Sequence, residues 1–121
     1  MTINKQLLIY MFMQSAVAAE DKMFYALADP SRRAIFKSLM RGEAAVKDLT
    51  AQFDISQPAV SQHLALLKDA GLVCGRKDGR SVYYRVEPKG MKPLIDWVAH
   101  YRAFWTEHVH RLEKLLEKLD E

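Results

Sequence analysis

A run of sixteen residues, from Ser56 to Gly71, constrains the fold most strongly because it marks both ends of one short helix. Ser56 is a favoured N-cap, Pro58 falls in the first turn where its missing N–H costs nothing, and Gly71 is a natural helix terminator. At about 100° per residue, this helix separates an apolar side from a polar side. The apolar side holds Ala59, Val60, His63, Leu64, Leu66, Leu67 and Ala70, and the polar side holds Gln57, Pro58, Ser61, Gln62, Ala65, Lys68 and Asp69.

The polar side is typical of a helix that enters a DNA major groove with its N-terminal end. Its first turns carry two amides and a hydroxyl with no bulky or acidic neighbour, and such groups bond to base edges. We therefore predict a recognition helix. Its predicted DNA-binding residues are Ser56, Gln57, Pro58, Ser61, Gln62 and Lys68.

The residues just before the recognition helix predict the first helix of a helix-turn-helix. Val46, Leu49 and Phe53 are spaced for one face of a helix, which would pack against the recognition helix and brace it. We therefore expect residues 46–71 to form the helix-turn-helix.

Another helix is predicted after a break at residues 29–31, running through Met40 and ending at Gly42. Residues 21–28, before the break, are expected to form a separate helical piece. Four cations lie on or near the helix that follows the break, and they either face solvent or approach phosphate. These cations are Arg32, Arg33, Lys37 and Arg41.

After Gly71 the residue pattern changes from helical to β-rich. Strand-forming segments at residues 72–74 and 82–86 flank an Asp-Gly pair, which is a strong signal for a hairpin turn. Residues 72–86 are therefore expected to form a wing whose tip lies over the DNA backbone or a minor groove. A charged turn that only adds solubility is the alternative. The cations around the tip are Arg76, Lys77 and Arg80.

Taken in order along the chain, these motifs resemble the ArsR/SmtB family of bacterial winged helix-turn-helix repressors. The likeness runs from Ala26-Leu27-Ala28-Asp29-Pro30-Ser31-Arg32-Arg33, through Glu43 to Leu49, Ser56 to Leu64 and Ala70 to Val73, to Tyr83-Tyr84-Arg85-Val86. It involves about half of the chain. The resemblance implies a dimeric regulator that binds operator DNA and usually releases it when a metal, a redox signal or another cue arrives.

One metal site of the family lies at the start of the helix before the turn, where a Cys-Val-Cys run supplies thiolate ligands. Ala45 and Lys47 stand at the matching positions in this sequence. Alanine has no donor atom, and lysine is a charged non-ligand at neutral pH. We therefore predict that this site is absent.

A second family site, on the last helix, uses Asp-x-His and, ten residues later, His-x-x-Glu. His110 and Glu113 match its second half, but Trp97 and Ala99 occupy the first half. His100 is one residue away from the needed position, which turns it about 100° around the helix. We predict no metal and no cofactor, and the sequence identifies no effector. Weak zinc binding completed by a second subunit is the alternative.

The two ends of the chain predict a dimer. Residues 3–20 lack Gly and Pro and form an apolar helix, while residues 91–119 form a helix of about 27 residues, about 40 Å long. The apolar residues of the long helix recur in alternating steps of four and three, as in a seam between two helices. A second copy of the chain is the expected partner of both helices. The predicted interface residues are Leu7, Met11, Trp97, Tyr101, Trp105, His108 and Leu112.

His108 interrupts this apolar seam. We interpret it as a neutral, packed histidine, and a protonation switch at the dimer contact is the alternative. His63, on the inner side of the recognition helix, is likewise interpreted as a packing residue.

Charge and cysteine content fit a single DNA-binding domain. The net charge of the 121 residues is +3, but residues 31–86 hold ten Lys or Arg against five Asp or Glu, which makes the middle of the chain basic. A lone Cys74 excludes an internal disulfide and fits a cytoplasmic protein. The first twenty residues imitate a secretory signal peptide, but the apolar run of residues 7–13 is at the lower limit of length. We therefore interpret this segment as a retained helix.

The sequence predicts a mainly α fold with a small β-hairpin: one winged helix-turn-helix domain, residues 1–121, that dimerises through its N- and C-terminal helices. We predict no catalytic residues, because the sequence contains no Gly-rich phosphate loop, no Gly-x-Ser-x-Gly and no acidic pair near a histidine. The predicted function is a sequence-specific homodimeric repressor that binds an inverted-repeat operator in double-stranded DNA, without a membrane partner. A winged-helix module that binds another protein is the alternative.

Overall fold

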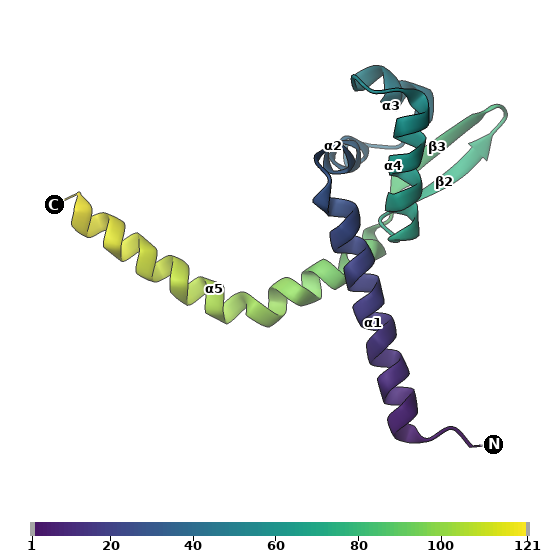
Figure 1. The fold of residues 1–121 in the computed structure, drawn as a ribbon. Coiled ribbons are helices and arrows are strands. Elements are labelled where there is room, and N and C mark those ends of the chain that lie inside the picture. The colour runs from purple at the N-terminus through teal and green to yellow at the C-terminus, as the bar shows by residue number, and fades with distance from the viewer. Residues whose placement is uncertain (1, 121) are drawn as a thin grey trace.

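The structure, a computed structural model, describes residues 2–120. It is mainly α-helical with a small β-hairpin, as the sequence predicted, and a further short strand extends the hairpin to a three-stranded antiparallel sheet. Helices α2, α3 and α4 and the hairpin β2–β3 gather at one end as a compact winged body. Two long helices, α1 and α5, leave this body in different directions as arms (Figure 1).

Helix α1 spans Lys5–Ala28 without a break, so the prediction of two separate pieces was wrong. Nothing in this stretch stops a helix, because it contains neither glycine nor proline. The Asn4 side chain caps the start by accepting a hydrogen bond from the Gln6 backbone N–H at 3.0 Å. The helix ends where Asp29 becomes extended, because the residue before a proline avoids the helical region.

Helix α2 spans Pro30–Leu39, and Asp29 caps it by accepting a hydrogen bond from the Arg32 backbone N–H at 3.0 Å. Strand β1, Ala44–Ala45, follows, and then helices α3, Val46–Gln52, and α4, Gln57–Asp69. The sequence did not predict β1, which pairs antiparallel with β3. Two alanines carry no strand signal of their own, so the neighbouring strand determines this element.

The wing consists of β2, Val73–Asp78, and β3, Ser81–Val86, with β3 in the middle of the sheet. The strands reach farther toward the tip than predicted, and only two residues join them. The first of these, Gly79, has a φ of +63°, as glycine does at the first central position of a type II′ hairpin turn.

A short 3-10 turn, Pro88–Met91, leads from the wing into α5, Lys92–Leu119. Gly90 in this turn lies directly on the end of the recognition helix, because a Cβ at position 90 would overlap the carbonyl oxygen of Gly71. The start of α5 is therefore held against the last turn of α4.

The hydrophobic core lies almost wholly in the winged body. Its fully buried large side chains come from α2, α3, α4 and the start of the wing, whereas α1 contributes Met23 and Ala26 from its last turns. Helix α5 has no buried residue at all in its described length. No helix within residues 2–120 is both long and apolar enough to cross a membrane.

Candidate nucleic-acid interface

Helix α4 has the ends that the sequence predicted. The Ser56 hydroxyl accepts a hydrogen bond from the Ala59 backbone N–H at 3.3 Å, and Gly71 follows the last turn with a φ of +77°. Val60, Leu64 and Leu67 are buried, and α4 packs against α1, α2 and α3 through this side. Leu66, expected on the apolar side, is instead 36% exposed.

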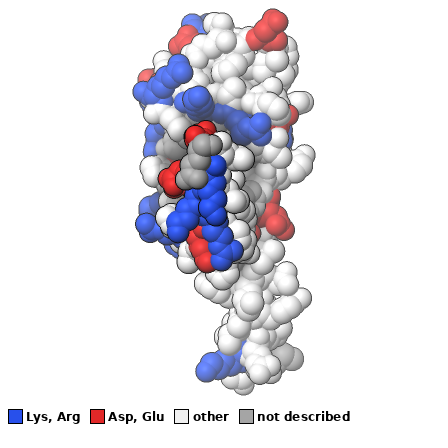
Figure 2. All heavy atoms as spheres, turned by 90° about the vertical axis from the view of Figure 1, so that its left-hand side faces the viewer, with Lys and Arg blue, Asp and Glu red and all other residues white. Residues whose placement is uncertain are grey.

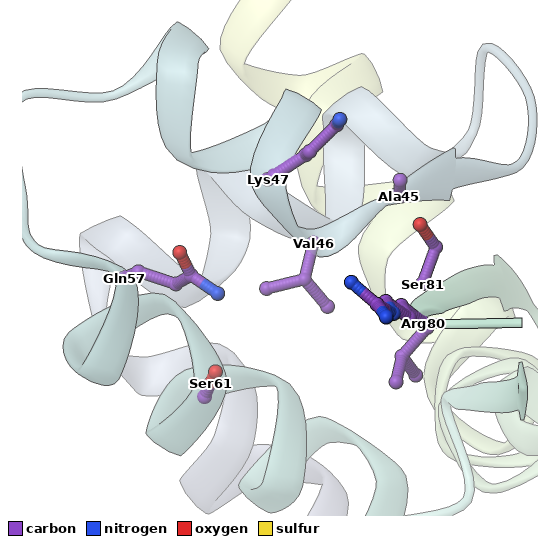
Figure 3. Close-up of a pocket in the computed structure, with 8 residues that line it drawn as sticks. Ala45, Val46, Lys47, Gln57, Ser61, Arg80 and Ser81 are labelled. Carbon is purple, nitrogen blue, oxygen red and sulfur yellow. The ribbon is translucent and has the colours of Figure 1, made fainter.

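The predicted polar side of α4 faces outward. Gln57 and Ser61 line a hollow with a volume of about 300 Å³, and Arg80 from the wing lies across it (Figure 3). Gln62 and Lys68 are exposed but do not line this hollow, and neither do Ser56 and Pro58. The fold thus brings α4 and one wing cation to the same open space.

The third wall of the hollow is the start of α3. Val46 lies between Gln57 and Arg80, while Lys47 stands at the rim with its amine directed away from the hollow (Figure 3). From the sequence alone, Lys47 is only a missing metal ligand, and it is not in the predicted DNA-binding set. One signal could have identified it. Lys47 directly follows Val46, an inward-facing residue of the helix that braces α4, so it had to lie close to the recognition helix.

The three wing cations have different surroundings. An Arg76 guanidinium nitrogen lies 2.6 Å from the Glu43 carboxylate and another lies 3.5 Å from that of Asp78, and the guanidinium lies 4.7 Å from the Tyr83 ring centre. The hydrogen bond from Arg76 lowers the pKa of Glu43 below its ordinary value. Lys77 and Arg80 are exposed, and neither forms an ion pair within residues 2–120.

Arg76 therefore connects the wing to the segment before β1. Contact between Arg76 and DNA stays a prediction, and it would require phosphate to displace Glu43. Lys77 and Arg80 need no such exchange before they meet a phosphate.

The first cations of α2 do not have the surroundings expected from the sequence. Arg32 is only 9% exposed, and both Arg32 and Arg33 donate hydrogen bonds to backbone carbonyls at the end of α1. Neither the solvated face nor the phosphate contact that we expected describes Arg32, which is a buried structural residue. Lys37 and Arg41 are exposed.

The positions of the two family metal sites hold few donor groups. Ala45 is buried in β1, and Lys47 is exposed. His110 and Glu113 lie beside a shallow hollow on α5 with Trp105, Thr106 and Val109. Within residues 2–120, the structure brings no three His, Cys, Asp or Glu side chains together as a metal site.

Most of the residues predicted for a dimer contact are exposed on the two arms, but Trp97 contacts the other arm of the same chain. Near the body the arms cross, where Phe24 of α1 meets Trp97 of α5 edge to face at 5.7 Å. Tyr101, one turn later on α5, lies 5.1 Å from Trp97. Farther out the arms diverge (Figure 1). His108 stacks on Phe104 and its Nδ1 lies 2.8 Å from the Phe104 carbonyl oxygen. The remaining predicted contacts, all exposed, are Leu7, Met11, Trp105 and Leu112.

Comparison with known proteins identifies the family of this chain. The model of the family described as "Bacterial regulatory protein, arsR family" matches residues 29–74. The HTH-type transcriptional regulator Rv2034 of Mycobacterium tuberculosis is 38% identical over 103 residues, which are 85% of this chain and 94% of that protein. The transcriptional repressor SdpR of Bacillus subtilis is 31% identical over 81 residues, 67% of this chain and 90% of that protein.

The fold agrees with this result. The crystal structure of an ArsR family transcriptional regulator superposes with a TM-score of 0.68 and 32% sequence identity, covering 74% of this chain and 92% of the other. The named relatives are transcriptional regulators and not enzymes, in agreement with the prediction from the sequence. The chain belongs to the ArsR family of bacterial regulatory proteins, which are DNA-binding transcriptional regulators.

Proposed function

We propose that this protein is a homodimeric repressor that binds an inverted-repeat operator, with α4 of each subunit in a major groove. The observation that carries the proposal is the hollow of about 300 Å³ where the start of α4 and the tip of the wing meet. Gln57 and Ser61 offer base-bonding groups on one side of it, and Arg80 offers a positive charge on the other.

The outward side of α4 supports sequence recognition. Gln57, Ser61 and Gln62 are exposed near its N-terminus, the end that approaches base edges when such a helix docks. A glutamine amide can bond to both N6 and N7 of adenine, which distinguishes this base in the major groove. Lys47 and Arg80 line the hollow at this end, and Lys77 is an exposed cation on the wing. These charges suit phosphate contacts, which add affinity without sequence information.

The arms support a dimer. Seven consecutive residues of α1, from Leu7 to Met13, are apolar and each at least 50% exposed. At about 100° per residue such a run faces every direction, so one neighbouring helix cannot cover it. A second copy of the chain could cover this apolar run with two helices, its own α1 and its own α5. Between Lys5 near its tip and Glu20, the arm formed by α1 carries no Asp, Glu, Lys or Arg, and its outer part is largely uncharged (Figure 2).

The two-fold symmetry of the proposed dimer is the reason to expect an inverted repeat in the operator. A symmetric dimer presents two recognition helices related by the same axis, so its DNA half-sites are inverted copies. Their centres should lie about one helical turn, or a small multiple of it, apart.

The direct test is to incubate the protein with fragmented genomic DNA at moderate salt and to sequence the fragments that it retains. We expect enrichment of an imperfect inverted repeat, and a mass of two chains per operator duplex by light scattering. Gln57→Ala combined with Gln62→Ala should abolish the enrichment, while the matched control Gln14→Ala on α1 should preserve it. Retention of fragments without any shared sequence would contradict the proposal and favour a module that binds another protein.

A further inference from the structure

The last four carbonyl groups of α1 are all bonded by two arginines of α2. Arg32 donates from Nε and a terminal nitrogen to the carbonyls of residues 26 and 25 at 2.8 and 3.2 Å. Arg33 donates to the carbonyls of residues 27 and 28 at 2.7 and 3.0 Å. Terminal carbonyls have no partner within their own helix, and positive charge is favoured at this end of the helix dipole. Both arginines therefore cap the C-terminal end of α1.

Arg32 also reaches the recognition helix, and Arg33 has no such contact. The remaining terminal nitrogen of Arg32 lies 3.5 Å from Nδ1 of His63, in the second turn of α4. His63 is partly buried, and the same Nδ1 lies 4.0 Å from the Asp29 carboxylate that caps α2. One buried guanidinium thus touches both the end of α1 and α4. Arg33 is exposed, and the hydrogen bonds that its side chain makes within residues 2–120 all go to α1.

The contact between Arg32 and His63 requires one form of the imidazole. A guanidinium nitrogen offers only hydrogens, so Nδ1 of His63 must accept and its proton must sit on Nε2. Arginine stays charged at all ordinary pH values, and a buried charge needs an acceptor for each of its donors. His63 supplies the acceptor that the backbone of α1 does not reach, so the contact is directional although it is long.

We propose that Arg32 and His63 are positioning residues for DNA recognition, because their contact fixes the rotation of α4 relative to α1. This inference rests on the proposed function. Ser61 and Gln62 directly precede His63, and successive helical residues differ by about 100° in direction. Holding His63 inward therefore keeps these two base-reading side chains directed outward. The contact also connects α4 to α1, one of the two arms of the proposed dimer.

A second polar link between α1 and α4 does not compete with this contact. Lys22 and Asp69 approach to 3.6 Å, but both side chains are more than half exposed. An exposed ion pair is screened by solvent and salt and fixes little geometry. The Lys22→Ala variant therefore serves as a control that removes a link between the same two helices.

The experiment compares full-length variants on two duplexes: an inverted-repeat fragment retained by the unmodified protein, and a scrambled duplex of equal length. The measured quantity is the ratio of the two affinities, with thermal unfolding and light-scattering mass as checks on fold and assembly. Arg32→Met and the matched Arg33→Met each remove capping bonds from α1, but only the first removes the contact with α4. His63→Leu removes the acceptor, and His63→Gln keeps a side-chain oxygen as an acceptor.

We expect Arg32→Met and His63→Leu each to lower the affinity ratio by about tenfold, as the loss of a hydrogen bond to a charged group would. Their combination should lose no more than either change alone. His63→Gln should recover most of the ratio, and Arg33→Met and Lys22→Ala should retain it.

Two results would overturn the inference: an unchanged ratio for a folded His63→Leu variant, or equal losses for Arg32→Met and Arg33→Met. If Arg32→Met does not fold, the two His63 variants decide alone, because His63 bonds none of the α1 carbonyls. Failure of the proposed function looks different, because the unmodified protein itself would then not distinguish the two duplexes.

Discussion

The winged body and the two arms contain similar apolar side chains, but the body buries them and the arms expose them. In the body, residues such as Leu49 and Leu64 are fully buried, and the helices and sheet of one chain cover them. In the arms, residues such as Phe12 and Leu119 are 78% and 79% exposed. Large exposed apolar surfaces mark sites of association. The body thus covers its apolar side chains within one chain, and the arms leave theirs exposed.

The largest expected effect tests whether the arms are completed by a second copy. Replacing Trp105 and Leu112 together with alanine should remove about 2 to 4 kcal/mol of buried apolar contact each, enough to dissociate or unfold the dimer. Light scattering at micromolar concentration would give one chain for the variant and two for the unmodified protein. A mass of one chain for the unmodified protein would show that the arms have another role.

A core substitution tests the other half of the comparison. Leu64→Ala should lower the free energy of unfolding by about 2 to 5 kcal/mol, because it leaves a cavity in the body. Chemical denaturation should give about the same loss across a tenfold range of protein concentration, whereas the loss from the arm variant should depend on concentration. A strongly concentration-dependent loss for Leu64→Ala would mean that the body itself relies on the partner.

Within the body, substitutions in the recognition helix and in the wing should change DNA binding in different ways. Gln62→Ala should cost about 1 to 3 kcal/mol on the operator and little on random DNA, because it removes a base contact. Arg80→Ala should weaken both DNAs alike and flatten the slope of log affinity against log salt by about one unit per subunit. Titrations at several salt concentrations measure both quantities, with Lys118→Ala on α5 as the control. The reverse pattern would contradict the proposed docking of α4.

The pair formed by Glu43 and Arg76 predicts a smaller effect that depends on pH. The folded pKa of Glu43 lies below its unfolded value, so the pair stabilises the protein above the ordinary carboxyl pKa and stops doing so as pH falls through the folded pKa. Glu43→Gln should therefore be slightly less stable at neutral pH and equal to the unmodified protein in strong acid.

The same variant leaves Arg76 with Asp78 as its remaining acidic partner, so the salt slope on DNA should become steeper by up to about one unit per subunit. Thermal unfolding between acid and neutral pH, together with salt titrations, measures both effects. An unchanged stability difference throughout the acid range would show that the ion pair does not stabilise the wing.

The last prediction is that metal ions have no effect on operator affinity. Because Ala45, Lys47, Trp97 and Ala99 occupy ligand positions of the family sites, operator affinity should be the same with chelator, zinc, arsenite or copper. Anisotropy titrations with one metal ion per subunit measure this. A tenfold loss with metal that His110→Ala abolishes would reveal a site completed by residues not identified in this chain.

The sequence predicted those elements whose signals are local. Ser56 marks the start of α4 through its side-chain cap, Gly71 marks its end through a positive φ, and the hairpin turn of the wing follows from the glycine at position 79. Strand β1 was not predictable, because its pairing partner lies about forty residues later in the chain.

The same limit applies to the candidate site. Gln57, Ser61 and Arg80 were all in the predicted DNA-binding set, and the structure shows that they line one hollow. The roles of Arg32 and Arg76 depend on partners 31 and 33 residues away in the chain, namely His63 and Glu43. A charged residue looks the same in a sequence whether it faces solvent or a buried acceptor, so these contacts needed the fold.

Gly90 lies outside every proposed interface, yet it sets the direction in which an arm leaves the body. Its missing side chain lets the 3-10 turn before α5 lie directly on the carbonyl of Gly71. Helix α5 has 28 residues, so its far end is about 42 Å from its start. A side chain at position 90 would have to push this turn away from Gly71 and so tilt the whole arm. A tilt of only about 5° would move the far end of α5 by about 4 Å, which is most of the ~5.4 Å pitch of a helix.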